Sequence, residues 1–343
     1  MIIYRRDDIA PKVQIRAGER KLGETVRFLR HDEGVDDLPD YFAKDVRYAL
    51  VGIPESIGTV ANFGQCCTDH AWPAFLQAFL NMQDNRFLPG EHIVCLGHVD
   101  AHALNEEARN TNEANALRTL CGRLDEKVFP VIRAVAKAGL IPVVIGGGHN
   151  NAFPILKGVA AAQPATTGIQ CVNCDPHADF RPLEGRHSGN AFSYAYREGF
   201  LKRYFVLGLH ENYNSHYIIE QLDANEDISY SRFDLNPDIT GHIQKALSFL
   251  MQADLPVGIE LDMDSLIDMP SSAMTPSGFR VEEARQYVRT VAAESTPVYL
   301  HLPEGAPVPG TPEMLKIGKT LAYLATDFMK ACNQKDLVRI ERK

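Results

Sequence analysis

Residues 168–179 read Gly-Ile-Gln-Cys-Val-Asn-Cys-Asp-Pro-His-Ala-Asp. The first part is an apolar run typical of a buried strand, and it ends in Asp175, His177 and Asp179 at every second position. Alternate residues of an extended chain project from one face. Two carboxylates and an imidazole gathered there are costly to bury unless a cation joins them. The pattern predicts a site for a divalent metal, and a solvated turn at the end of a strand is the alternative interpretation.

Two further apolar runs end in residues of the same kind. Residues 141–145 are followed by three glycines and His149, and residues 256–259 lead through a glutamate to Asp262 and Asp264. The carboxyl ends of parallel strands meet at one edge of a sheet, where ligand sites assemble. Such an edge offers four carboxylates and two imidazoles, enough for two cations that share bridging carboxylates: Asp175, Asp179, Asp262, Asp264, His149 and His177. An oxygen-rich set with some imidazole favours Mn²⁺ over Zn²⁺.

The bulk composition indicates a globular protein with a sizeable core. The 343 residues are 45% hydrophobic and 23% charged, and the net charge is -9. A disordered chain is thereby excluded, and nothing points to a nucleic-acid partner. No apolar stretch approaches the ~20 residues that a membrane helix needs, and residues 1–8 lack the long apolar segment of a signal peptide. We therefore expect a cytoplasmic protein without nucleic-acid or membrane partners.

The seven cysteines are an odd number and lack the spacing of a small disulfide-rich domain, which suits a reducing compartment. Cys171 and Cys174 form a Cys-x-x-Cys. Residues three apart on a strand face opposite sides, however, and no second Cys-x-x-Cys completes a zinc site. We interpret both as small buried hydrophobes. The adjacent pair Cys66-Cys67 likewise has no partner motif.

Strand-like and helix-like segments alternate along most of the chain. About eight strands are predicted, at residues 46–54, 92–97, 141–145, 168–172, 203–208, 228–233, 256–259 and 298–302. Helical spacing covers residues 72–82, 117–138 with a kink or break at Pro130, 152–162, 281–293 and the segment after 311. This alternation predicts an α/β fold with a mostly parallel sheet covered on both faces. Residues 1–44, charged and irregular, are predicted to be an N-terminal arm, and residues 45–343 one catalytic domain.

Two other polar stretches are candidate sites. The glycines at 146–148 let the backbone bend sharply. A phosphate loop is excluded there because the Lys-Ser/Thr of a P-loop and the spacing of a dinucleotide fingerprint are both missing. His98, Asp100 and His102 repeat the alternating pattern of ligands just beyond another strand. A polar loop at a strand end is the favoured interpretation of these three, with a metal site as the alternative.

Gly-Gly-Gly-His149, then Asp175-Pro-His-Ala-Asp179, then Asp262-Met-Asp264, in this order and at these separations, resemble the motifs of the ureohydrolases: arginase, agmatinase and formimidoylglutamase. The resemblance extends roughly from Tyr48 to the C-terminus. It implies a three-layer α/β/α fold, trimers or hexamers, and a dinuclear manganese centre with two Mn²⁺ per subunit. Carried over to this sequence, the family pattern implies that His149 and Asp179 bind the first metal and that His177 and Asp264 bind the second. Asp175 and Asp262 would bridge the two metals.

Details resemble the formimidoylglutamase branch. Gly148 stands where arginases and agmatinases usually have Asp, and Asp179-Phe180-Arg181 is similar to the branch's Asp-Leu-Arg. Residues 188–192, Ser-Gly-Asn-Ala-Phe, resemble its Ser-Gly-Thr-Pro-Phe, with Phe192 where arginases carry a catalytic-site His. The segment after the last aspartate is also longer, as in that branch.

The substrate side of the motif set departs from the family in three places. Asn190 replaces the usual Thr, and Gln65 stands where Arg is common. Residues 302–307, Leu-Pro-Glu-Gly-Ala-Pro, replace the family's Glu-Val-Asn-Pro or Glu-Leu-Asn-Pro. Glu304 still aligns with the glutamate that binds the substrate's cationic group. Because these changes leave the six metal positions intact, they bear on substrate identity.

The resemblance implies hydrolysis of a linear amidine, with N-formimidoyl-L-glutamate as the expected substrate and L-glutamate and formamide as products of histidine breakdown. Asp264 would accept a proton from a metal-activated water and pass it to the leaving nitrogen. Glu304 would pair with the cationic group. The expected substrate contacts are Arg181, Ser188, Asn190, Asn214 and Glu304. For Arg181, a salt bridge to Glu184 is the alternative.

Two other functions stay open at this point. One is a guanidine hydrolase that releases urea from agmatine, arginine or a guanidino acid. The other, from a different class, is a non-catalytic metal-binding assembly protein in which the altered segment around Glu304 has lost substrate binding. Product identification on a panel of substrates separates the first from an amidine hydrolase, and bound Mn²⁺ without turnover favours the second.

Overall fold

The computed structural model describes residues 1–42, 45–163 and 168–341. A single nine-stranded sheet forms its centre. The strands are β1 (Ile2–Ile3), β2 (Tyr48–Gly52), β3 (Ile93–His98), β4 (Ile141–Ile145), β5 (Ile169–Cys174), β6 (Leu201–Leu209), β7 (Ile228–Arg232), β8 (Val257–Leu261) and β9 (Pro297–Leu302). Their spatial order is β1-β3-β2-β4-β9-β8-β5-β6-β7. Every pairing is parallel except the antiparallel β1–β3 pair at one edge.

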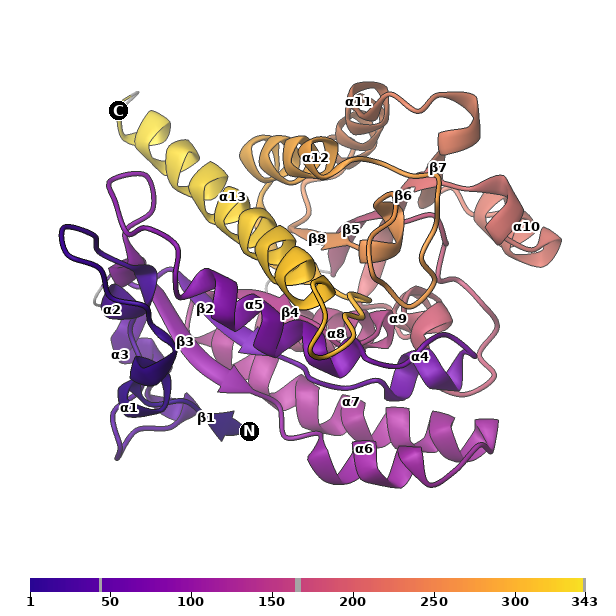
Figure 1. The fold of residues 1–343 in the computed structure, drawn as a ribbon. Coiled ribbons are helices and arrows are strands. Elements are labelled where there is room, and N and C mark those ends of the chain that lie inside the picture. The colour runs from indigo at the N-terminus through magenta and orange to yellow at the C-terminus, as the bar shows by residue number, and fades with distance from the viewer. Residues whose placement is uncertain (43–44, 164–167, 342–343) are drawn as a thin grey trace.

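Helices cover both faces of this sheet. One face carries α5 (Ala71–Phe79), α11 (Ile239–Leu250), α12 (Val281–Glu294) and α13 (Glu313–Glu341), and the other carries α7 (Ala114–Lys137), α8 (Ala152–Ala162), α9 (Ala191–Arg197) and α10 (His216–Asp223). Figure 1 shows α12 and α13 on one side of the strands and α7 on the other. The shorter helices are α1 (Arg6–Ile9), α2 (Leu22–Thr25), α3 (Leu38–Phe42), α4 (Ile57–Ala61) and α6 (His102–Arg109). The predicted three-layer α/β/α fold is confirmed.

The strands are buried on both faces because their apolar residues supply two separate cores. In β5, Val172 and Cys174 pack in the cluster that includes α11 to α13, whereas Cys171 packs in the cluster that includes α7 to α10. Successive residues of a strand point to opposite faces, so a continuous apolar run serves both layers. This arrangement also confirms that Cys171 and Cys174 are buried small side chains on opposite faces and not a zinc pair.

A kink or break was predicted at Pro130, and the structure shows that there is no break. Helix α7 continues through this proline from Ala114 to Lys137. Proline in a helix interior costs about 3 kcal/mol or more, but α7 packs along α8 at close range. A Cβ added at Gly158 of α8 would lie 2.9 Å from the Cβ of Ile132. Tertiary packing of the apolar stripe therefore outweighs the local cost.

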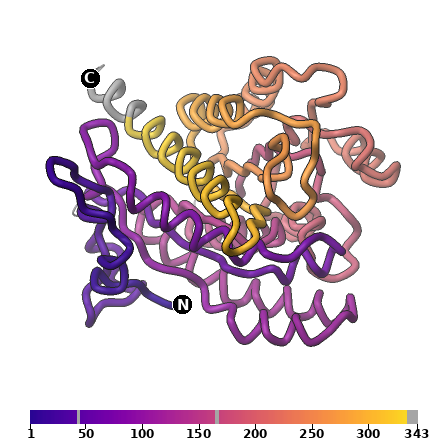
Figure 2. Tube along the Cα trace, viewed as in Figure 1, coloured from indigo at the N-terminus to yellow at the C-terminus, as the bar shows by residue number. Residues whose placement is uncertain are grey.

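Residues 1–42 lie at one end of the molecule. Figure 2 shows this segment in indigo, at the side opposite α10 and α11. Ile2 and Ile3 pair with the end of β3, and Ile9 and Leu22 are buried in the core beneath α5. Residues 43 and 44, at the predicted boundary of the arm, lie outside the described residues. Within the described part of the chain, no helix is both long and apolar enough to cross a membrane.

Candidate metal centre

The carboxyl ends of four neighbouring strands, in the order β4, β9, β8 and β5, deliver the predicted site residues. After β4 comes His149, after β9 Glu304, after β8 Asp262 and Asp264, and after β5 Asp175, His177 and Asp179. All seven side chains gather at one edge of the sheet, which is where parallel strands position ligand sites. His149 and Glu304 are more than 150 residues apart in the sequence. They come together because β4 and β9 are neighbours in the sheet.

His149 lies at the centre of the carboxylates and is fully buried. Its Nδ1 is 2.8 Å from Oδ2 of Asp262, 3.0 Å from Oδ2 of Asp179 and 3.2 Å from Oδ2 of Asp175. Three carboxylates thus converge on one imidazole nitrogen, as they would on a cation. Phe192 packs edge-on against the ring, with 5.1 Å between centroids.

His177 lies on the cavity side of the same carboxylates. Its Nδ1 is 3.4 Å from Oδ1 of Asp175 and 3.8 Å from Oδ2 of Asp264. The ring stacks on Tyr213, with 5.3 Å between centroids. Asp175 therefore directs one oxygen toward His149 and the other toward His177, which links the two halves of the centre.

The loops that carry the aspartates are fixed by the aspartates themselves. Oδ1 of Asp175 accepts a hydrogen bond from the backbone N–H of His177 at 2.7 Å, and Oδ1 of Asp262 accepts one from the N–H of Asp264, also at 2.7 Å. Such side-chain-to-backbone bonds two residues on are typical of Asx turns. In both cases Oδ2 is left to face His149. The alternation of acidic residues after each strand thus fixes the loop and aims the carboxylate.

Crowding perturbs the protonation of the whole group. Burial disfavours the charged imidazoles, but the carboxylates outweigh it, so the pKa of His149 is raised well above its ordinary value and the pKa of His177 is raised to about 9. Burial and the charges of Asp264 and Asp175 raise the pKa of Asp262, and burial raises the pKa of Asp264. For Asp175, hydrogen bonds from both imidazoles outweigh burial and lower the pKa.

These donors fit a divalent cation. One ligand atom each from His149, Asp175, Asp179 and Asp262 lies within 4.8 Å of all the others. The carboxylates bear charge that a buried site must neutralise, and a divalent ion would do so in place of shared protons. Carboxylate oxygen with some imidazole is a donor set suited to Mn²⁺ among the first-row metals.

Glu260 lies behind His149 and is a residue that sequence reasoning missed. It is fully buried on β8 and pairs in register with His301 of β9. Its Oε2 is 2.7 Å from Nδ1 of His301 and 3.4 Å from Nε2 of His149, while Oε1 accepts a hydrogen bond from Tyr299 at 2.8 Å. Gly258 makes room for the Tyr299 ring, which a Cβ would approach to 2.4 Å. The signal was available, because Glu260 extends the alternation of acidic residues at the end of β8.

Glu55, the third residue after β2, organises the turn that carries His149. Its Oε1 accepts hydrogen bonds from the N–H of Gly148 and the side chain of Asn151, both at 2.7 Å, and its Oε2 accepts one from the N–H of Ile57 at 2.6 Å. Gly147 has φ +75°, and a Cβ there would lie 2.9 Å from Oε1 of Glu55. The same Cβ would lie 2.6 Å from Nδ2 of Asn151 and 2.8 Å from the carbonyl oxygen of Ile53, so the packing of all three groups requires glycine here. No local pattern marks a lone glutamate for such a role.

A cavity of about 770 Å³ opens onto the centre. His177, Asp264 and Glu304 line its inner end, and Arg181 and Ser188 line its wall. Glu304 has φ +67°, and its Oε1 accepts a hydrogen bond from the N–H of His149 at 2.5 Å. Its Oε2 is buried without a hydrogen-bond partner among the described residues. Burial, reinforced by the charge of Asp264, raises the pKa of Glu304 well above its ordinary value.

The two asparagines predicted as substrate contacts already form hydrogen bonds with neighbouring loops. Asn214 borders the cavity, but its Oδ1 accepts from the N–H of Ala178 and its Nδ2 donates to the carbonyls of Pro176 and His210. Asn190 is fully buried, and its side chain bonds to Arg186, His187, Pro182 and Gly185. Both residues hold the loops around the cavity in this structure.

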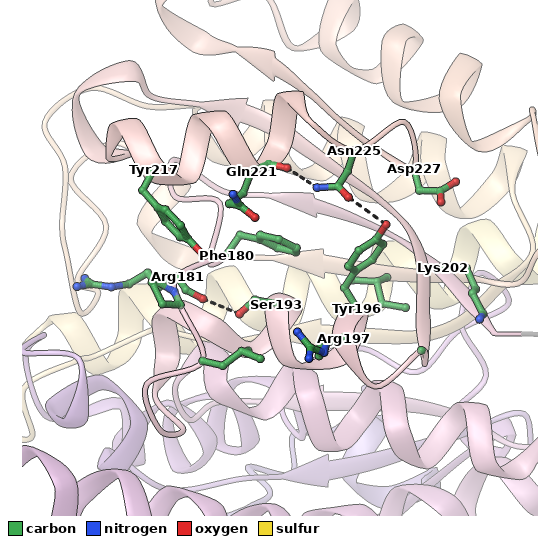
Figure 3. Close-up of a pocket in the computed structure, with 14 residues that line it drawn as sticks. Phe180, Arg181, Ser193, Tyr196, Arg197, Lys202, Tyr217, Gln221, Asn225 and Asp227 are labelled. Carbon is green, nitrogen blue, oxygen red and sulfur yellow. Dashed lines mark hydrogen bonds between the residues drawn. The ribbon is translucent and has the colours of Figure 1, made fainter.

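Arg181 lies between the centre's cavity and a neighbouring cavity of about 550 Å³. Figure 3 shows this second cavity, with Ser193, Tyr196 and Arg197 along it and the guanidinium of Arg181 pointing away from them. The Nε of Arg181 is 3.8 Å from Oε1 of Glu184, and the side chain is 46% exposed. The long ion pair leaves the guanidinium accessible from the cavity of the centre.

The group around His98 does not join the centre. Nδ1 of His98 is 2.9 Å from the hydroxyl of Tyr4, and Oδ1 of Asp100 accepts a hydrogen bond from the backbone N–H of His102. Neither of the two candidate metal clusters found among the described residues includes any of these three side chains. They form the polar loop that the sequence favoured.

A three-layer α/β/α protein with buried carboxylates and imidazoles at the carboxyl edge of its parallel sheet has the architecture of a metal-dependent enzyme of the ureohydrolase class. The arginase family model matches residues 14–326. The chain belongs to the arginase family.

Two relatives within the family are formimidoylglutamases. The chain is 29% identical to the formimidoylglutamase of Geobacillus thermodenitrificans over 228 residues, which cover 61% of this chain and 66% of the relative. It is 26% identical to that of Streptococcus pyogenes over 268 residues, or 66% of this chain and 77% of the relative.

Two solved structures share the fold. The formimidoylglutamase of Bacillus subtilis superposes with a TM-score of 0.72 at 17% identity and covers 94% of each chain. Trypanosoma cruzi formiminoglutamase with Mn²⁺ superposes with a TM-score of 0.70 at 20% identity, covering 91% of this chain and 99% of the other.

Uptake of Mn²⁺ by the metal-free protein should release protons. A metal-bound imidazole is neutral, whereas the raised pKa of His177, about 9, keeps it protonated at pH 7. Apparent affinity should therefore rise with pH until the pH passes about 9. Titration calorimetry at pH 7 in two buffers of different ionisation enthalpy should report about one proton or more per chain. Binding heats that do not depend on the buffer would contradict this account of the centre.

The Glu260→Gln variant should bind Mn²⁺ roughly 10- to 100-fold more weakly, because the carboxylate orients His149 through Nε2. The measurement is competition with a fluorescent chelator. Tyr299→Phe is the matched control, since it removes the partner of the other oxygen and keeps the carboxylate. Unfolding of the metal-free proteins separates a lost orientation from a lost fold. Unchanged Mn²⁺ affinity in a normally folded Glu260→Gln protein would refute the role.

Proposed function

We propose that the chain hydrolyses N-formimidoyl-L-glutamate to L-glutamate and formamide, a step of histidine breakdown, with two Mn²⁺ ions per subunit. The observation that carries the proposal is the buried group of carboxylates and imidazoles that opens into a cavity bordered by Glu304 and Arg181. It is supported by the formimidoylglutamases among the similar proteins and by the Mn²⁺ of the Trypanosoma cruzi structure.

His149 and Asp179 would hold one ion, and His177 and Asp264 would hold the other. Asp175 and Asp262 would be shared between the two ions. The distances support this division. Asp179 lies 3.0 Å from His149, and Asp175 has one oxygen 3.2 Å from His149 and the other 3.4 Å from His177. A carboxylate that reaches both imidazoles with different oxygens is the arrangement that a bridging ligand needs.

The bound metal pair would supply a water of lowered pKa, the nucleophile that the amidine carbon requires. Asp264 would take the proton of that water and deliver it to the leaving nitrogen as the C–N bond breaks. Formamide keeps the oxygen of the water, and glutamate leaves as the amine. Asp264 is suited to hold a proton because burial raises its pKa, and the N–H of Ala273, donating to its Oδ1 at 3.1 Å, holds the carboxylate in position.

Glu304 would bind the cationic amidinium. The N–H of His149 fixes one carboxylate oxygen, and the buried, unpartnered second oxygen is available for a charge-assisted hydrogen bond. A cation in the cavity would stabilise the ionised form of Glu304. It would thereby offset the effect of burial, which raises the pKa of this residue. Positioning of this kind brings the reacting carbon to the nucleophile without further entropy loss.

Arg181 would pair with a carboxylate of the substrate, and Ser188 would contribute a hydroxyl from the adjoining wall of the cavity. Asn190 and Asn214 were predicted as direct contacts. Their hydrogen bonds to the surrounding loops support a role in holding Arg181 and Ser188 in place.

The chain would act in the cytoplasm as a homo-oligomer, a trimer or hexamer. No disulfide joins any of the seven cysteines among the described residues, which is in keeping with a reducing compartment. Light scattering of the purified protein tests the assembly.

Protein loaded with Mn²⁺ should release equal amounts of glutamate and formamide from N-formimidoyl-L-glutamate. A chelator should abolish the turnover and added Mn²⁺ should restore it. Agmatine, arginine and guanidino acids serve as the competing panel, with urea as the product to detect. Urea release without formamide would replace the substrate assignment with a guanidine, and bound Mn²⁺ without any turnover would favour the non-catalytic alternative.

The Asp175→Asn variant should lose metal and activity together, because the amide oxygen cannot replace a carboxylate shared between two ions. Hydrolysis should fall by at least roughly a hundredfold, and Mn²⁺ content, measured by mass spectrometry of the metal, should drop below that of the parent. Asp100→Asn is the matched control, from a loop that lies outside the centre. Full activity with both ions retained would refute the assignment of Asp175.

The Arg181→Ala variant should raise KM for N-formimidoyl-L-glutamate roughly fivefold, the effect of about 1 kcal/mol at a half-exposed site, and leave kcat nearly unchanged. Arg197→Ala provides the comparison, since Arg197 lines the second cavity but not that of the centre. Steady-state kinetics with both variants test the contact. An equal KM in Arg181→Ala and the parent would show that the guanidinium serves its ion pair with Glu184.

A further inference from the structure

Cys66 and Cys67 follow the loop that forms one wall of the metal-centre cavity. Residues 62–65 line this cavity directly. The two sulfur atoms are 3.5 Å apart. Cys66 is exposed and Cys67 is partly exposed, whereas the five other cysteines are buried, and no disulfide joins any of the seven in the described part of the chain. A reagent in solution therefore meets one vicinal dithiol and no other accessible thiol among the described residues.

The backbone holds this pair in a defined turn. Cys67 has φ +79°, in the left-handed region that non-glycine residues seldom adopt. Its carbonyl accepts a hydrogen bond from the N–H of His70 at the start of a short helical turn. The thiol pair thus has a fixed conformation before any reagent binds.

The distance between the sulfurs suits an atom that bridges them. A disulfide needs about 2.05 Å between sulfurs, so the pair would have to close by well over an ångström. With bonds of about 2.3 Å, the length of a zinc–thiolate bond, a bridging atom would subtend about 100° across the observed 3.5 Å. That angle is close to the pyramidal geometry of trivalent arsenic.

The protonation state of Cys67 also favours reaction with an arsenic(III) oxide over formation of a disulfide. Burial, the contact with the Cys66 thiol and the nearby charges of Asp69 and Glu313 raise the pKa of Cys67 to about 11. The attacking species in disulfide exchange is a thiolate, and the raised pKa makes the thiolate of Cys67 scarce at neutral pH. In the reaction with an arsenic(III) oxide, the thiol protons are themselves consumed.

We propose that Cys66 and Cys67 form a bidentate site for trivalent arsenicals at the rim of the metal centre. Each thiol forms one S–As bond, the As=O bond breaks, and the two thiol protons leave with the oxygen as one water. Arsenic stays trivalent and sulfur stays at the thiol level, so no oxidant or reductant is needed. The site is independent of which amidine or guanidine the centre hydrolyses.

Backbone hydrogen bonds on both sides of the pair connect it to the centre. The N–H of Gln65 donates to the carbonyl of Ser272 at 3.1 Å, and the N–H of Gly147, in the turn before His149, donates to the carbonyl of Thr68 at 3.4 Å. The hydroxyl of Ser272 in turn donates to Asp264. A bridging atom that holds the two sulfurs at the spacing they already have would therefore restrain the chain between these two backbone hydrogen bonds, so that they open less often.

Phenylarsine oxide added to the Mn²⁺-loaded full chain tests the site by intact mass. We expect one phenylarsine group per chain, formed with loss of one water, stable to a monothiol and removed by a dithiol. Cys66→Ser and Cys67→Ser each leave one thiol and should take up no stable adduct. Cys66 is exposed, so its serine variant folds independently of this contact. Uptake by Cys66→Ser equal to the parent, or no uptake by the parent, would overturn the proposal.

Hydrogen exchange tests the connection to the centre without relying on activity. In the arsenical adduct, the amides of Gln65 and Gly147 should exchange at least roughly threefold more slowly than in the untreated protein. Cys66→Ser treated in the same way should show no change. Adduct formation in the parent with both exchange rates unaltered would overturn the connection, although the thiol site itself would stand.

Discussion

The structure depends on the burial of like charges at one point. Four aspartates converge on two imidazoles at distances of 2.8 to 3.8 Å, and most of these groups are buried. Isolated buried carboxylates are prohibitively costly, so they must share protons or bind cations. The raised pKa values of His149 and of Asp262 record that strain in the metal-free protein. The pair of divalent ions that we propose would relieve this repulsion and would at the same time provide a Lewis-acidic centre.

The surrounding fold holds this unfavourable assembly together. The strand order β4-β9-β8-β5 brings the ligands to one edge, and two apolar cores clamp the sheet from both sides. Two further glutamates position His149 from the side away from the cavity. Glu260 lies 3.4 Å from Nε2 of its ring, and Glu55 binds the glycine turn that carries His149. Each of these two carboxylates is matched by several donors, which holds it rigidly in place. The cavity above the centre remains open for a substrate.

Much of this arrangement could be predicted from the sequence, because its signals are local. Apolar runs followed by alternating ligands at 175–179 and at 262–264 predicted both the strands and the edge where they meet. The partners of Glu55 and Glu260 depend on register between strands distant in sequence, which local patterns do not encode. A break at Pro130 was predicted because proline disfavours a helix locally. The packing of α7 on α8, which outweighs this local cost, is a tertiary contact that the local sequence does not show. The occupied side chain of Asn190 could not be foreseen for the same reason.

The most direct test of the central claim is anomalous diffraction from a crystal of the Mn²⁺-loaded protein, recorded at the manganese edge. The account predicts two peaks per chain, roughly 3.5–4 Å apart as in other two-metal sites. One ion should lie against His149 and the other against His177, with Asp175 and Asp262 between them. A single peak, or manganese bound away from these carboxylates, would contradict the account and leave the buried charges to be explained by shared protons alone.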